Sequence, residues 1–318
     1  MIVDRFARTA GLVLAGLLAL GTAHAAEPQE CRDVGIANVN WTGVSVKSDT
    51  AQRILQALGY KTTLTTASVP IAFQAVASGE RDFFLGLWLP TQQSMIKPFL
   101  EKDQVEQVVA NLEGAKYTLA VPTYVWEAGV KSFSDLDKYK DKFDGRILGI
   151  EAGNDGNQII QSMIDKDAFG LGDWQLMPSS EAGMLTQVKR STQRDEWAVF
   201  LGWAPHPMNL NIDMKYLTGG ADFFGPDQGG ATVYTIATTG YTQKCANVGR
   251  FLKQYTYSVE EQSRAGGYVI NQDIDTLEAG VKLIQEKPEL LDRWLSGVKT
   301  ADGEQDAIPA VKKALEMQ

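Results

Sequence analysis

Hydrophobic positions in the first third of the chain follow two different spacings. Between residues 48 and 59 the apolar side chains recur every three or four positions, which predicts an amphipathic helix that Gly59 closes. A second helix is expected over 70–78. The run over 34–39 predicts a buried strand, another strand is expected to start over 60–64, and a third is expected over 83–88. The resulting order is βαβαβ, which implies a parallel sheet with helices on its faces.

A second alternating series begins near residue 117. Strands are expected over 117–121, 147–150 and 197–201, and helices over 134–136, 158–166 and 182–189. Ser134 is the expected N-cap of the first of these helices. After a strand over 231–238, further helices are expected at about 246–256, 258–264, 271–286, 288–297 and 306–316. Ser258 and Glu261 form a capping-box pattern at the start of the helix over 258–264.

The N-terminus has the pattern of a secretory signal peptide. Two arginines precede an apolar run over 10–20, and a small-x-small cleavage site follows at 23–25. The run is shorter than the about 20 residues that a membrane-spanning helix needs. We therefore expect cleavage after Ala25 and a soluble, periplasmic mature chain.

The net charge limits the possible partners, and the length limits the number of domains. The 318 residues carry a net charge of −9, and loss of the expected signal, which is net positive by one, leaves −10. This balance argues against nucleic acid or an anionic membrane surface as the partner. The about 290 residues that remain suit two domains or one large one.

The two cysteines of the chain bear on its topology. In an exported protein Cys31 and Cys245 can pair with each other, although two free thiols are the alternative. A bond would bring the start of the mature chain beside residues near 245. We then expect one discontinuous domain made of 29–112 and 214–318 and a second domain of 113–213. The two chain crossings would form a hinge, with a ligand in the cleft between the domains.

The sequence offers little for catalysis. Once the signal is removed, His206 is the only histidine, and a disulfide would use both cysteines. There is no nucleophile elbow, H-E-x-x-H motif or phosphate-binding P-loop. A glycosidase-like pair of carboxylates stays open, because one sequence cannot pick it out. We expect a protein that is not an enzyme and that holds no metal and no cofactor.

Aromatic residues stand at the ends of several predicted strands. The four with this placement are Trp41, Trp88, Tyr117 and Trp203. Any one of them alone is more typical of core packing. Together, on both sides of the expected hinge, they can line a pocket whose ring faces attract a cation that lacks hydrogen-bond donors. The tryptophans without this placement are interpreted as packing residues: Trp126, Trp174, Trp197 and Trp294.

Several motifs carry a family resemblance. They are N-W-T-G at 40–43, F-L-G-L-W-L-P at 84–90, E-A-G-N-D-G-N at 151–157 and F-L-G-W-A-P-H at 200–206. In this combination the mature chain resembles the substrate-binding proteins of ABC importers for glycine betaine, choline and carnitine, and their choline-binding branch in particular. The resemblance implies a type II periplasmic-binding-protein fold: two α/β domains, each with a mixed, mostly parallel sheet. It also implies a membrane permease with cytoplasmic ATPase subunits as the partner of a monomeric receptor.

The resemblance also implies roles for individual residues. The four rings match the box around trimethylammonium, and the cysteines match the disulfide of the choline-binding branch. Asn154 matches an asparagine that contacts the polar end of the ligand, and an N-cap role is the equal alternative. Asp155 could place a negative charge near the ligand or only favour a helix N-terminus. Thr42, directly after the first box tryptophan, is included in the expected site.

One position departs from the choline-binding pattern. These proteins carry an aspartate two residues past the first box tryptophan, where it accepts a hydrogen bond from choline, and this chain has Gly43. Without the aspartate carboxylate, the site has one reason fewer to prefer choline and no longer repels a ligand that carries its own carboxylate. We also expect glycine at this position to leave free volume and an accessible backbone N–H. The expected ligand is therefore carnitine, ahead of glycine betaine, with choline as an alternative.

His206 is expected either to contact a ligand carboxylate or to hold a proline-rich turn together. An exported enzyme acting on quaternary amines and a sensory receptor are the alternative functions. The sequence does not separate a sensory receptor from a transport receptor.

Overall fold

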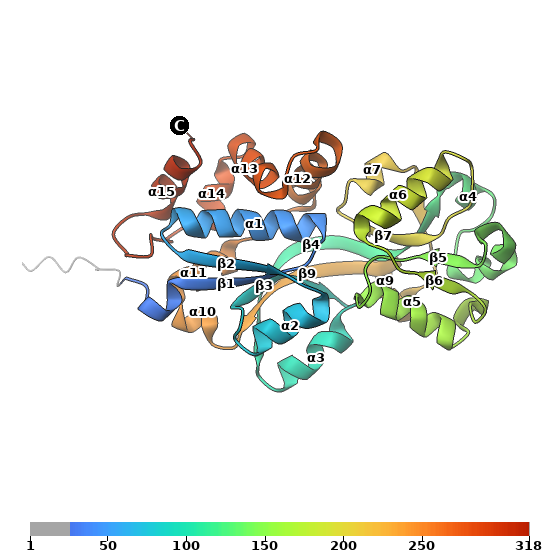
Figure 1. Ribbon diagram of the computed structural model, residues 1–318, viewed down its shortest axis with the longest axis horizontal. Helices are drawn as coiled ribbons and strands as arrows, with labels where there is room; N and C mark the ends of the chain where they lie inside the picture. The colour runs from blue at the N-terminus through green and yellow to red at the C-terminus, as the bar shows by residue number, and fades with distance from the viewer. Residues whose placement is uncertain (1–25, 318) are drawn as a thin grey trace, which may run out of the picture.

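The computed structural model describes residues 26–317, so the expected signal peptide lies outside the described part of the chain. Two α/β lobes are joined by the long strands β4 (Val105–Pro122) and β9 (Gly230–Thr238), which run from one lobe into the other (Figure 1). The boundaries expected at 112/113 and 213/214 stay a prediction. The strand β4 passes through the first of them without a break.

The first lobe contains the predicted βαβαβ unit. Its strands are β1 (Asp33–Asn38), β2 (Lys61–Thr66) and β3 (Phe83–Leu89), and β1 pairs in parallel with both others. The helices between them are α1 (Thr42–Ala57) and α2 (Val69–Ala77). Gly59 ends the first helix with φ of +90°, a conformation that glycine adopts at little cost.

The second lobe is built on the far ends of β4 and β9. Its shorter strands are β5 (Arg146–Leu148), β6 (Gln175–Met177), β7 (Phe200–Ala204) and β8 (Met214–Tyr216). The helices α5 (Asp155–Asp165) and α6 (Glu181–Thr192) carry the residues that face the first lobe. Across both lobes the sheet is continuous, in the order β2-β1-β3-β9-β4-β7-β5-β6, with β8 on β4. The α/β prediction is confirmed, and the two expected sheets merge through the shared strands.

The remaining elements are short helices around this sheet. Those between β3 and β9 are α3 (Gln93–Glu101), α4 (Thr123–Glu127), α7 (Met208–Asn211), α8 (Ala221–Phe224) and α9 (Pro226–Gly229). Those after β9 are α10 (Tyr241–Lys244), α11 (Ala246–Gln254), α12 (Val259–Gln272), α13 (Thr276–Glu286), α14 (Glu289–Trp294) and α15 (Ala307–Ala314). The 3₁₀ helices are η1 (Gln29–Cys31), η2 (Phe133–Asp135), η3 (Asp137–Phe143) and η4 (Ala168–Gly170).

Several element boundaries differ from the expectation. The helix expected from residue 48 begins at Thr42, and the strand expected over 197–201 lies at 200–204. The helix expected over 258–264 continues to Gln272.

The predicted cap Ser134 is wrong. Ser132 caps the turn instead, because the Asp135 carboxylate accepts from its backbone N–H at 2.9 Å and from its hydroxyl at 2.7 Å. The capping box of Ser258 and Glu261 is confirmed.

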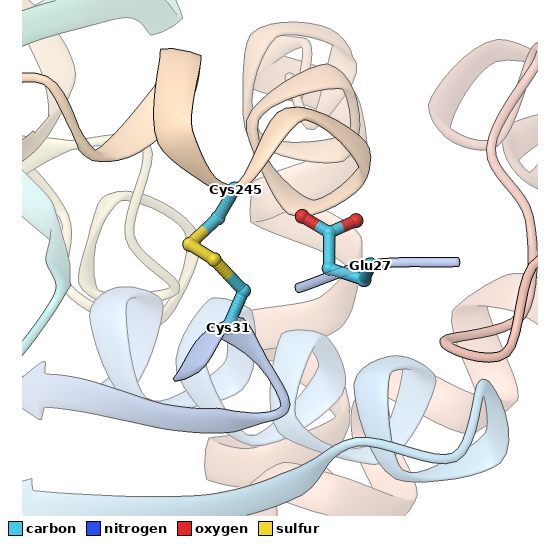
Figure 2. Close-up of side chains that lie close together, drawn as sticks. All are labelled: Glu27, Cys31 and Cys245. Atoms are coloured by element: carbon cyan, nitrogen blue, oxygen red, sulfur yellow. A yellow bond between two sulfur atoms is a disulfide. The ribbon is translucent and has the colours of Figure 1, made fainter. Parts of the chain in front are cut away.

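A disulfide ties the start of the described chain to the segment between α10 and α11. Cys31 and Cys245 are bonded, with their Cα atoms 5.4 Å apart. Figure 2 shows the Glu27 carboxylate close to this bond, and Glu27 accepts from the backbone N–H of Asn247 at 3.0 Å. Sulfurs bonded to each other offer no thiolate, so these three side chains do not form a metal site in this state.

Hydrophobic residues gather into two cores. One lies under α1 and the C-terminal helices and includes the disulfide. The other extends from α2 and β3 into the second lobe and includes all four candidate box rings.

Within residues 26–317, none of the helices is both long enough and apolar enough to cross a membrane.

Candidate ligand-binding site

The four predicted rings meet at one cavity between the lobes. Trp41 is the N-cap of α1, Trp88 lies in β3, Tyr117 in β4 and Trp203 in β7. Tyr117 and Trp203 are directly opposite each other in the antiparallel pairing of their strands, which explains why residues so far apart in sequence meet. The exposed fractions of the four side chains are only 5–9%.

The four rings line this cavity together, and each of them is buried. Tyr117 stands edge-on to Trp88 and to Trp203, with centroid distances of 6.0 and 6.2 Å. The other residues of the lining are Gly43, Val44, Ile150, Pro205 and Gln262. The lining is therefore aromatic and aliphatic, with one amide, and a bare cation would meet ring faces rather than carboxylates.

One half-buried and one buried carboxylate lie just behind the rings. The Trp41 indole donates to Glu151 Oε1 at 2.7 Å, which holds this ring against the second lobe. Asp155 is 1% exposed and accepts from Gln92 Nε2 at 3.2 Å, while Gln92 Oε1 accepts from the backbone of Trp88 at 2.9 Å. Burial raises the pKa of both Glu151 and Asp155. In their ionised forms the two groups make the potential at the cavity favourable to a cation.

Tyr117 is a neutral phenol in this setting. Burial, together with the nearby Asp155, raises the pKa of its hydroxyl well above the usual value. A Cβ on Gly156 would stand 2.1 Å from that hydroxyl, so the close approach of α5 to the ring requires glycine there. This explains the second glycine of the E-A-G-N-D-G-N motif.

Asn154 acts as the N-cap of α5. Its Oδ1 accepts from the backbone of Asn157 at 2.8 Å, and its Nδ2 donates to the carbonyl of Glu151 at 2.7 Å. Asn154 is not part of the cavity lining. The N-cap alternative is confirmed, and a contact between Asn154 and the ligand stays a prediction.

Thr42 and His206 meet at a carboxylate that bridges the lobes. Glu181, the first residue of α6, accepts from the Thr42 backbone at 3.1 Å and also from the Thr42 hydroxyl. The same carboxylate lies 3.1 Å from His206 Nε2. Since His206 Nδ1 accepts from the backbone of Met208 at 3.0 Å, the ring proton is on Nε2 and is donated to Glu181. The structural interpretation of His206 is therefore supported, and neither Thr42 nor His206 lines the cavity.

The space expected beside Gly43 is already occupied. A Cβ on Gly43 would stand 2.7 Å from Nε2 of Gln262, which comes from the first turn of α12. The expectation that the glycine leaves free volume is therefore wrong. Sequence reasoning missed Gln262 because it lies far along the chain from the N-W-T-G motif and in no motif of its own.

The four other tryptophans are packing residues, as expected. Trp294 and Trp174 are buried in the two cores, and Trp126 and Trp197 pack against the second one.

Two α/β lobes closed on an aromatic cavity define the class of solute-binding receptors. Residues 32–281 match the family described as the substrate binding domain of ABC-type glycine betaine transport systems, and the chain belongs to this family. Its members bind transported solutes and are not enzymes, which implies a small-molecule ligand and a membrane transporter as partner.

Three known proteins illustrate the likeness. An ABC-transporter choline-binding protein, solved with choline, is 43% identical with a TM-score of 0.88, over 91% of this chain and 100% of that one. The uncharacterized protein ORF1 of Chromohalobacter salexigens is 51% identical over 130 residues, 41% of this chain and 84% of that protein. The glycine betaine/carnitine transport binding protein GbuC of Listeria monocytogenes is 26% identical over 190 residues, 59% of this chain and 62% of that protein.

Proposed function

We propose that this protein captures a quaternary trimethylammonium compound between Trp41, Trp88, Tyr117 and Trp203 and delivers it to a membrane permease with cytoplasmic ATPase subunits. It works as a periplasmic monomer after cleavage behind Ala25. The observation that carries this function is the convergence of four rings, from four separate elements, on one cavity. Among residues 26–317, no charged side chain is part of its lining.

The chemistry of the ligand head favours such a cavity. Trimethylammonium has no N–H, so a carboxylate cannot hydrogen-bond it, whereas ring faces can surround its methyl groups. Each close cation–π contact contributes about 0.5–2 kcal/mol when the cation is desolvated. The half-buried Glu151 and the buried Asp155 add long-range attraction from behind the rings.

Among the quaternary ammonium compounds, we propose carnitine ahead of glycine betaine and choline. Gly43 stands where the resembled choline binders have an acceptor for the choline hydroxyl, and Gln262 places an amide there instead. An amide both donates and accepts, and carnitine offers both a carboxylate and a hydroxyl. The Listeria relative is a glycine betaine/carnitine transport binding protein, and the choline complex at 43% identity makes choline another candidate.

Calorimetry on the mature chain tests this function. Carnitine, glycine betaine, choline and tetramethylammonium should all bind, with carnitine tightest. Failure of tetramethylammonium, the bare ammonium head, to bind would overturn the proposed class of ligand. Choline binding at least about tenfold tighter than carnitine would overturn the proposed order.

A further inference from the structure

Gln262 has an unsatisfied polar group at the cavity. Its side chain lines the same space as the rings, and the residue is 5% exposed. Among the described residues, Oε1 of this amide is buried without a hydrogen-bond partner. Buried amide oxygens are nearly always paired in folded proteins, so an orphan oxygen that faces a binding cavity indicates a donor from the ligand.

The backbone holds this amide in place. Ser258 and Glu261 cap the first turn of α12 reciprocally, at 3.1 and 2.8 Å. Glu261 is in turn bound by Arg293 at 2.7 Å, and Arg293 also donates to the carbonyl of Thr256 at 3.0 Å. The turn that presents Gln262 is thus fixed without using the amide itself. The polar end of the side chain is left for another partner.

Gly43 and Gln262 form a matched pair. Because a Cβ at position 43 would stand 2.7 Å from Gln262 Nε2, any larger residue there displaces the amide. An aspartate at 43 therefore excludes the side-chain conformation that Gln262 adopts here. The glycine makes room for the amide rather than for the ligand.

We propose that Gln262 is the specificity-determining residue of the site and that it hydrogen-bonds the polar end of the ligand. Its Oε1 accepts a hydrogen bond from a ligand hydroxyl, and its Nε2 donates to a ligand carboxylate. The ligand class is a trimethylammonium compound that carries both groups. This inference rests on the proposed function, since the rings must first hold the ammonium head.

The test compares ligands that have and lack a polar end. Gln262→Leu keeps similar bulk and removes both hydrogen bonds. Carnitine affinity should fall at least about tenfold in this variant, while tetramethylammonium affinity stays within about threefold. Gln262→Glu supplies a carboxylate that accepts from choline and repels carnitine, so the ratio of choline to carnitine affinity should rise at least about tenfold.

Gln272→Leu is the matched control, because Gln272 is an exposed glutamine at the other end of the same helix. Thermal unfolding checks that each variant is folded, and Gln262→Asn replaces any variant that is not. Equal losses for carnitine and tetramethylammonium, or no loss for either, would overturn the role of Gln262. If the wild-type protein binds tetramethylammonium to no measurable extent, the proposed function itself has failed, and this is seen before any variant is made.

Discussion

The hydrogen bonds between Thr42 and Glu181 should control how firmly the lobes close on a ligand. Thr42 begins α1 in the first lobe and Glu181 begins α6 in the second, so opening the lobes would break these bonds (Figure 1). The variant Thr42→Val keeps the shape of the side chain and removes the hydroxyl donor. The backbone N–H of residue 42 is retained, so the variant isolates a single bond.

The expected size of the effect follows from the charge and burial of the acceptor. A hydrogen bond to a charged group contributes about 1.5–3 kcal/mol, which corresponds to about 10- to 150-fold in an equilibrium constant. Glu181 is 6% exposed when the lobes are together. In the open form water can hydrogen-bond the Glu181 carboxylate in place of the Thr42 hydroxyl. The variant therefore destabilises the closed form and leaves the free energy of the open form nearly unchanged. Because tight binding requires closure, we predict that affinity falls about tenfold or more.

Calorimetry with carnitine and with tetramethylammonium measures this effect. Both ligands should lose affinity by the same factor, because Thr42 is outside the cavity lining. The control is Thr63→Val, at an exposed threonine on β2. Affinities within about twofold of wild type for both ligands would refute the reasoning. A loss confined to carnitine would also refute it, and would indicate that Thr42 contacts the ligand directly.

Three further predictions concern pH and the pair at the cavity. Desolvation lowers the pKa of buried Lys47 to about 7, so above that pH the unfolded chain binds more protons than the folded chain. The free energy of unfolding should therefore rise from about pH 7 towards pH 10. Chemical denaturation measures it, and a flat profile would contradict this prediction. Because burial raises the pKa of Asp155, its protonation in acid should weaken tetramethylammonium binding, which calorimetry at falling pH measures. Gly43→Asp alone should abolish carnitine binding in the same assay, and adding Gln262→Ala should restore binding with a preference for choline.

The parts of the fold that follow local rules could be predicted from the sequence. The βαβαβ unit over 34–88 follows from strands that alternate with one amphipathic helix and one apolar helix. The rings could be found because each stands at or next to an end of a predicted strand, although Tyr117 lies inside the longer strand β4. The disulfide follows from having two cysteines in a chain that is expected to be exported.

Other features depend on tertiary contacts that the sequence does not encode locally. The first part of β4, from Val105, mixes polar and apolar residues, and its register on β9 shifts several times, so no simple alternation marks it. Glu181 looks like an ordinary acidic residue in the first turn of a helix, and only the closed lobes place it on Thr42. The side chain of Gln262 can lie at the cavity because Gly43 has no Cβ, and no spacing along the chain reveals this contact.

The central claim is that the four rings form a site for a quaternary ammonium head. The most direct measurement is the affinity of tetramethylammonium for the wild-type mature chain and for Trp203→Ala, with circular dichroism to confirm folding. Removal of one ring from the cavity should weaken binding at least about tenfold, through the lost cation–π contact and the lost apolar surface. An unchanged affinity in a folded variant would contradict the account.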